Sequence, residues 1–205
     1  MQHTAAPGEP LADDFYRAAD EALGRALDAG FIVGLVADHG MRAKAGADGE
    51  PNVRYLDEAL AAAQITGCQT LCPITDPYVA HHAALGSLAW VHLEDLEQRD
   101  RARAALAALP GVEGVLDRAA AATAFDLPGD RIGDLVVLGD AHTVLGRSRE
   151  AHDLSALRGT LRSHGGLHER TVPLIVCAPI PAGALAGREL HNRDLHDILL
   201  NVVTA

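Results

Sequence analysis

The sequence predicts an α/β fold in which a small α+β cap interrupts a core sheet. Three observations predict it. A helix ended by glycine leads into a continuous apolar run, a second apolar run lies near the end of the chain, and short strands alternate with helices between them. With 205 residues, 48% of them hydrophobic, the chain is long enough to bury a core.

The first helix is expected to begin at a cap, Asp13 or Asp14, and to end at Gly30. Its apolar side chains share one face: Phe15, Ala19, Ala22, Leu23, Ala26 and Leu27. The run FIVGLVA (31–37) follows directly. An unbroken apolar run is typical of a strand that is buried on both faces of a parallel sheet.

The cap is predicted over residues 51–132, inserted into a core formed by 1–50 and 133–205. Within the cap we expect a helix, two strands, a second helix and one further segment, at 53–65, 69–74, 87–93, 93–109 and 111–125. The core resumes with strands at LVVLG (135–139) and VPLIVCAPI (172–180), and ends in a helix over 193–203 that Asn192 caps. Elements from the two ends of the chain are expected in one layer.

Composition excludes several function classes. Seventeen basic and twenty-eight acidic residues give a formal charge of −11, which argues against binding to a nucleic-acid backbone. An anionic substrate must then be held locally, by metals or helix N-termini. No apolar run approaches the roughly 20 residues that a membrane span needs. The odd set of cysteines (Cys68, Cys72 and Cys177), without a secretion signal, indicates reduced thiols in the cytoplasm.

Asp38 and His39 stand where the first apolar run ends, and ligands collect at that edge of α/β sheets. A carboxylate beside an imidazole offers the oxygen and nitrogen donors that suit Zn²⁺. Gly40 permits a sharp turn beneath the ion. The alternative is a helix-capping aspartate beside an exposed histidine.

His164 is the second candidate, because Gly165 and Gly166 after it permit a close approach of the backbone to a ligand. The alternative is a purely structural loop histidine. His168 and Glu169 are read as partners of this site or as surface residues. His3, in QHTAAPG, is the third candidate, although on its own it would be read as part of a frayed terminus.

Together these segments resemble a known family. QHTAAPGEPLADDFY, ADHGMRAK, PITDPYVAHHAALGS, LPGDRIGDLVVLGD and LRSHGGLHERTVPLI are similar, in order and spacing, to segments of the phosphonoacetate hydrolases, within the alkaline phosphatase superfamily. The resemblance extends over essentially the whole chain. It implies that the core is part of an alkaline-phosphatase-like sheet.

The resemblance implies a centre of two zinc ions. Asp38 and His39 match the pair that binds one ion together with an early Asp and a nucleophilic Thr. His3 and His164 match two ligands of the other ion. The Asp of the pattern D-Y-x-Q-H would fall before Met1, and the family's nucleophilic Thr and substrate-binding lysines also lie upstream. We therefore expect four ligands, no catalytic nucleophile, and partial zinc occupancy or none.

In this family, the C–P bond of phosphonoacetate, a small phosphonate, is cleaved to phosphate and acetate. Threonine attacks phosphorus, the departing carbanion is delocalised into its carboxylate, and water then hydrolyses the phospho-enzyme. We expect little or no activity from this chain alone. Two alternatives stay open: a non-catalytic binding module that keeps the cap and half of the metal site, and a different phosphodiesterase of the superfamily.

Several residues receive weaker predictions. Lys44 is read as a solvated loop lysine, and His81 and His82 as cap or surface residues. Arg42 and His168 depart from the family pattern near the entrance of the site. Without upstream strands, the two apolar runs of the core would have unpaired edges, so we expect a homodimer or a rearranged core.

Overall fold

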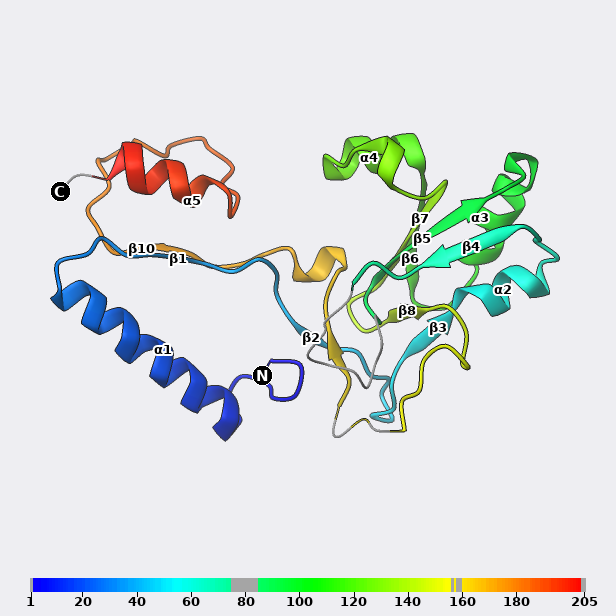
Figure 1. Cartoon of the computed structure of the whole chain (residues 1–205), viewed down its shortest axis with the longest axis horizontal. Coiled ribbons are helices and arrows are strands. Elements are labelled where there is room, and N and C mark those ends of the chain that lie inside the picture. Colours follow the sequence, from blue (N-terminus) through cyan, green and yellow to red (C-terminus); the bar gives the residue numbers. More distant parts are fainter. Residues whose placement is uncertain (1, 75–84, 156, 158–159, 204–205) are drawn as a thin grey trace. The chain divides into compact units, whose positions relative to one another are not determined.

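The structure, a computed structural model, describes residues 2–74, 85–155, 157 and 160–203 (Figure 1). The chain divides into two compact units. Unit 1 comprises Met1–Gly40 and Thr171–Ala205, and unit 2 is Met41–Arg170. Both ends of the chain therefore build the same unit. Within the described part of the chain, no helix combines the length and apolar character needed to cross a membrane.

Unit 1 is a two-stranded ribbon with helices. Its elements are α1 (Pro10–Asp28), β1 (Gly34–Val36), β10 (Leu174–Val176), α5 (Asp194–Asp197) and the π-helical turn η4 (Ile198–Val202). β1 and β10 pair, so the two ends of the chain meet as expected, but the pairing is antiparallel. The predicted buried parallel strand is wrong, because an apolar run does not fix the direction of its partner and β10 runs back along β1.

The helix caps in unit 1 differ from the prediction. Glu9 occupies the N-cap of α1 and Pro10 the first turn, where the missing N–H of proline costs nothing. Asp13 lies inside that turn instead of preceding it. Arg193, not Asn192, stands at the cap of α5, with no side-chain capping bond.

Unit 2 holds the larger sheet, of order β4-β5-β7-β6, with all neighbours antiparallel. Its strands are β4 (Cys68–Leu71), β5 (Leu88–Leu93), β6 (Val112–Asp117) and β7 (Leu135–Gly139). The predicted strand LVVLG is confirmed as β7, and all five of its residues are buried. The central position explains this burial, because β7 has a neighbour on each side.

Helices cover both faces of this sheet. Val137 of β7 packs in a cluster with α2 (Leu56–Ala62) and α3 (Arg99–Ala107). The next residue, Val136, packs on the opposite face with α4 (Arg118–Phe125). Successive side chains of a strand point to opposite faces, so a fully apolar strand fits a sheet that is covered twice.

The other elements of unit 2 are short. They are β2 (Arg42–Ala43), β3 (Val53–Tyr55), β8 (Val144–Gly146) and β9 (Arg162–Ser163), with 3₁₀ turns η1 (Leu96–Gln98), η2 (Gly129–Arg131) and η3 (Leu167–Glu169). The helix predicted over 53–65 is wrong in its first turn, where β3 pairs in parallel with β8. The segment 111–125 contains β6 followed by α4.

Candidate metal centre

Asp38 and His39 follow β1 in unit 1 and act as one local arrangement. The Asp38 side chain is 87% exposed, and its Oδ1 accepts a hydrogen bond from the His39 backbone N–H at 3.0 Å. His39 Nδ1 lies 2.9 Å from the Gly40 carbonyl oxygen. A carbonyl can only accept, so Nδ1 carries the proton and the lone pair of the neutral ring is on Nε2. Nε2 lies 3.7 Å from Asp38 Oδ2.

This arrangement fits two ligands of a zinc ion. A carboxylate oxygen and an imidazole nitrogen face the same space, and both are donors that Zn²⁺ accepts. A ligating histidine commonly gives its other ring N–H to a carbonyl or carboxylate, which fixes the ring orientation and the tautomer. Gly40 supplies that carbonyl here.

An open hollow of about 550 Å³ adjoins Asp38 within unit 1. Its walls are formed by Val36, Ala37, Asp38, Asn192 and Arg193. The residues just before α5 therefore share a surface with the end of β1. Asp38 and Arg193 thus bring residues of opposite charge to the lining of one hollow.

His3 also belongs to unit 1, in the turn that precedes α1, and is half-buried. The Gln2 amide donates to the Tyr16 hydroxyl at 2.9 Å, and the Ala6 N–H donates to the Glu9 carboxylate at 2.9 Å. The segment is thus held against the start of α1 by several polar contacts, which contradicts a frayed terminus for these residues.

His164 belongs to unit 2 and follows β9 directly. Its carbonyl accepts from the Ser87 N–H at 2.9 Å. A Cβ at Gly165, where φ is +98°, would lie 2.6 Å from Ile74 Cγ1, and one at Gly166 would lie 2.8 Å from Ser87 Cβ. These glycines are needed for close packing of the chain on itself, whereas the sequence predicted that they permit a close approach to a ligand.

A buried ion pair holds the loop that carries His164. Lys44 and Glu169 have essentially no exposed surface, and Lys44 Nζ lies 2.9 Å from Glu169 Oε1. Glu169 Oε2 accepts from the Gly166 N–H at 3.0 Å. Burial lowers the pKa of Lys44, and the hydrogen bond and charge of Glu169 oppose that shift in part. The prediction of a solvated lysine is therefore wrong.

The same loop is fixed on its outer side. Arg42 donates to the His168 carbonyl at 3.2 Å, and β2 pairs with β9. His168 Nε2 lies 2.7 Å from Glu113 Oε2. Glu113 occupies an irregularity in the β6–β7 register, where an extra residue re-aims its side chain. Sequence reasoning named Lys44 and Glu169 but missed that they pair with each other, and the usable signal was that Lys44 is the only lysine of the chain.

The predicted ligands are thus divided between the units. Asp38, His39 and His3 belong to unit 1, and His164 belongs to unit 2. In neither unit do three or more His, Cys, Asp or Glu side chains of the described residues converge on one point. His81 and His82 lie outside the described residues.

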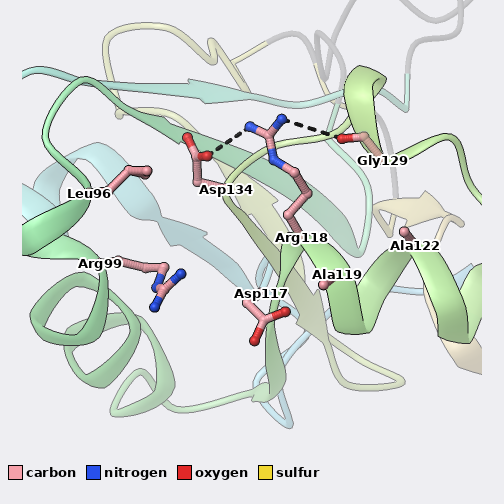
Figure 2. Close-up of a pocket in the computed structure, with 8 residues that line it drawn as sticks. All are labelled: Leu96, Arg99, Asp117, Arg118, Ala119, Ala122, Gly129 and Asp134. Atoms are coloured by element: carbon pink, nitrogen blue, oxygen red, sulfur yellow. Dashed lines mark hydrogen bonds and ion pairs between the residues drawn. The ribbon is translucent and has the colours of Figure 1, made fainter.

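A second hollow, of about 530 Å³, lies at the start of α4. Figure 2 shows Arg118 between Asp134 and Gly129 in this hollow. The Arg118 guanidinium lies 2.7 Å from Asp134 Oδ1 and donates to the Gly129 carbonyl at 3.3 Å. Asp134 Oδ2 also accepts from the Leu93 N–H at 2.9 Å. Arg118 and Asp134 are engaged with each other and with the backbone, so they join α4 to η2 and β5.

Comparison with distantly related solved structures shows the fold of the chain. A murine ectonucleotide pyrophosphatase/phosphodiesterase 5 is 17% identical, with a TM-score of 0.55 over 87% of this chain and 44% of that one. A second structure of that murine protein, an inactive variant in complex with AMP, gives a TM-score of 0.59 over 99% of this chain and 51% of that one, also at 17% identity. At this identity the likeness shows the fold alone, a mixed α/β fold.

The particular resemblance is to phosphonoacetate hydrolase. The enzyme from Sinorhizobium meliloti in complex with phosphonoformate is 43% identical, with a TM-score of 0.87. The same enzyme in complex with phosphonoacetate gives 43% and 0.86. Each match covers 97% of this chain and 48% of that chain. The resemblance to phosphonoacetate hydrolase is therefore confirmed, and the chain spans about half the length of these relatives. No family model matches the chain.

Proposed function

We propose that the chain is part of a zinc-dependent phosphonoacetate hydrolase and contributes metal ligands and the cap. The observation that carries this is the 43% identity along 97% of the chain to structures that hold phosphonoacetate and phosphonoformate. The likeness to the murine phosphodiesterase rests on 17% identity. The balance of identity favours a small phosphonate over a phosphodiester as substrate.

The residues that would hold the two zinc ions are Asp38, His39, His3 and His164. When bound, zinc would lower the pKa of a nucleophile and neutralise charge on the transferring phosphoryl oxygens. Asp38 supplies a carboxylate, and Gly40 holds the His39 ring with its Nε2 lone pair toward that carboxylate. The Lys44–Glu169 pair fixes the backbone that carries His164.

The catalytic nucleophile would come from outside this chain. In the family a threonine upstream of the matched motifs attacks phosphorus, and the sequence context of Thr4, Thr66 and Thr75 differs from that of the nucleophile. We propose that the chain alone binds zinc weakly and releases no phosphate. The three free cysteines accord with a reducing compartment, and we propose the cytoplasm.

Zinc titration by calorimetry tests the ligand assignment. Asp38→Ala and His39→Ala should each weaken zinc binding by about tenfold or more, because each removes a donor. Asp48→Ala, a change in the loop between β2 and β3, is the control and should leave binding unchanged. Unchanged zinc affinity in both ligand variants would refute the assignment.

Activity is tested on this chain fused behind the half of the S. meliloti enzyme that it does not align with. Phosphate release from phosphonoacetate, lost in the Asp38→Ala version, supports the proposal. Turnover of a nitrophenyl phosphodiester instead would identify a phosphodiesterase. Absence of turnover with both substrates in a folded, zinc-loaded fusion would identify the binding module.

A further inference from the structure

The hollow at the start of α4 lies within unit 2, and none of the predicted zinc ligands lines it. Its volume of about 530 Å³ falls in the range of small-molecule sites, roughly 300 to 1,000 Å³. Three parts of the chain form the lining: η1 with the first residue of α3, the junction of β6 and α4, and residues 129 and 134. A small molecule in this hollow would therefore contact all three.

Four charged side chains line the hollow, two guanidiniums and two carboxylates: Arg99, Arg118, Asp117 and Asp134. Arg118 and Asp134 form an ion pair of 2.7 Å. Arg99 and Asp117, both described residues, make no ion pair with each other, and Figure 2 shows them below the Arg118–Asp134 pair with no interaction joining them. The hollow thus offers a ligand one positive and one negative group.

Both of these groups are available for binding. The Arg99 side chain is 48% exposed, and within the described part of the chain its ion-pair partner is the adjacent Asp100, with 3.9 Å between Nε and Oδ1. An exposed pair of this kind holds a side chain only weakly. Asp117 uses Oδ1 to accept from the Ala120 N–H, so its Oδ2 can accept from a ligand.

The rest of the lining is apolar. Leu96 of η1 is 56% exposed, and Ala119 and Ala122 lie one turn apart on the same flank of α4. A Cβ at Gly129 would lie 3.7 Å from the Ala122 Cβ, so any side chain there would narrow the hollow. An apolar group placed against this wall would be removed from water together with part of Leu96.

We propose that this hollow binds a small zwitterion with an apolar body, of the class of α-amino acids with large apolar side chains. A simple anion would meet the carboxylates of Asp117 and Asp134, and a simple cation would meet the guanidiniums of Arg99 and Arg118. Because the lining carries no net charge, it suits a ligand that bears both charges.

Each part of such a ligand has a counterpart in the hollow. The planar guanidinium of Arg99 matches a carboxylate, and Asp117 Oδ2 can accept from an ammonium. The side chain of the ligand would pack against Leu96 and the alanines of α4. This binding goes beyond the proposed function and does not depend on it, since it involves neither zinc nor a phosphonate.

The test titrates the full chain with L-phenylalanine, glycine, 3-phenylpropionate and phenethylamine, and follows backbone amide shifts by NMR. Saturable shifts are expected at residues 96, 99 and 117–119. Phenylalanine should bind at least about threefold more tightly than each of the others, because each lacks one of the three contacts and partly exposed charge pairs contribute modestly. Absence of saturable shifts at these residues, or equal affinity for phenylalanine and any one of the others, overturns the proposal.

Two variants assign the charged contacts. Arg99→Gln should abolish the preference for phenylalanine over phenethylamine, since these ligands differ in the carboxylate. Asp117→Asn should abolish the preference over 3-phenylpropionate, which lacks the ammonium. Asparagine caps a helix about as well as aspartate, so α4 keeps its cap in this variant. Preferences that survive in both variants would overturn the assignment of these contacts.

Arg103→Gln is the matched control for Arg99→Gln. Arg103 lies one turn further along α3, also pairs with Asp100 and does not line the hollow, so its replacement should leave all four affinities unchanged. An effect equal to that of Arg99→Gln would overturn the contact at Arg99. Ala119→Leu, at an exposed position of the lining, should weaken phenylalanine binding at least about threefold by filling the hollow, and unchanged binding would contradict the proposal. The ligand series on the unaltered chain decides the question even if a variant fails to fold.

Discussion

At the scale of single residues, the buried Lys44–Glu169 ion pair is expected to contribute strongly to the free energy of unfolding of unit 2. Both groups are enclosed in unit 2, and Lys44 Nζ also donates to the Ala141 carbonyl at 3.2 Å. The desolvation penalty of each buried charge is compensated by the attraction of the other, so removal of one partner leaves the remaining charge uncompensated. Lys44 directly follows β2, and Glu169 belongs to the loop after His164, so the pair links these two segments.

Glu169→Gln should lower the free energy of unfolding by about 3 to 5 kcal/mol, because it leaves a buried ammonium without its counter-charge. Urea unfolding followed by circular dichroism measures this. Asp100→Asn, which disrupts the exposed pair with Arg103, is the control and should cost under about 0.5 kcal/mol. An equally small cost for Glu169→Gln would show that the buried pair does not stabilise unit 2.

Cysteine reactivity gives a second prediction. Burial, followed by the nearby Asp57 charge, raises the pKa of Cys72 from 9.0 to about 11, whereas Cys177 is exposed. At pH 8 iodoacetamide should therefore modify Cys177 well before Cys72, since the thiolate is the nucleophile. Mass spectrometry of timed samples measures the order. Faster modification of Cys72 would contradict the environment described for it.

The same shift has a consequence for stability. Above pH 9 the Cys72 thiol ionises first in the unfolded chain, so the folded state loses relative stability as the pH rises to about 11. The loss should be on the order of 2 kcal/mol and absent in Cys72→Ala. Urea unfolding at pH 8 and pH 11 measures it. Equal pH dependence in wild type and variant would exclude Cys72 as the cause.

At the scale of elements, α4 depends on its cap. Asp117 stands at the N-cap, and its side chain accepts from the Ala120 N–H at 2.9 Å. Asp117→Ala should cost about 1 kcal/mol of stability, because that N–H loses its acceptor. Thr123→Ala, an exposed position of the same helix, should cost nothing or stabilise slightly. Equal unfolding midpoints for the two variants would argue against the capping role.

Elements were predictable where local pattern decides them. The run of four apolar residues in LVVLG was enough to predict β7, since both faces of the sheet are covered. Val53–Tyr55 was missed because its strand character comes from pairing with β8, which is distant in sequence. The Asp38–His39 turn was likewise visible as a motif, whereas the partner of Lys44 lies in a loop that no local pattern connects to it.

At the scale of the whole molecule, the two units should differ in local stability. Unit 2 buries a four-stranded sheet under helices on both faces, and unit 1 rests on a two-stranded ribbon with an open face. Amides of β5 and β7 should exchange at least about a hundredfold more slowly than those of β1 and β10 in the isolated chain. Hydrogen exchange with mass spectrometry measures this, and uniform protection would contradict it.

The pairing of Leu35 with Ile175 also has a consequence for the order in which the two units fold during synthesis. All of unit 2 lies between these residues and is continuous in sequence, so it has every contact it needs before β10 leaves the ribosome. Pairing of β1 with β10 must then bring together segments that the whole of unit 2 separates in sequence, which makes its formation slow. A nascent chain would expose β1 until β10 emerges, and a chaperone that binds apolar segments could bind β1 during that time.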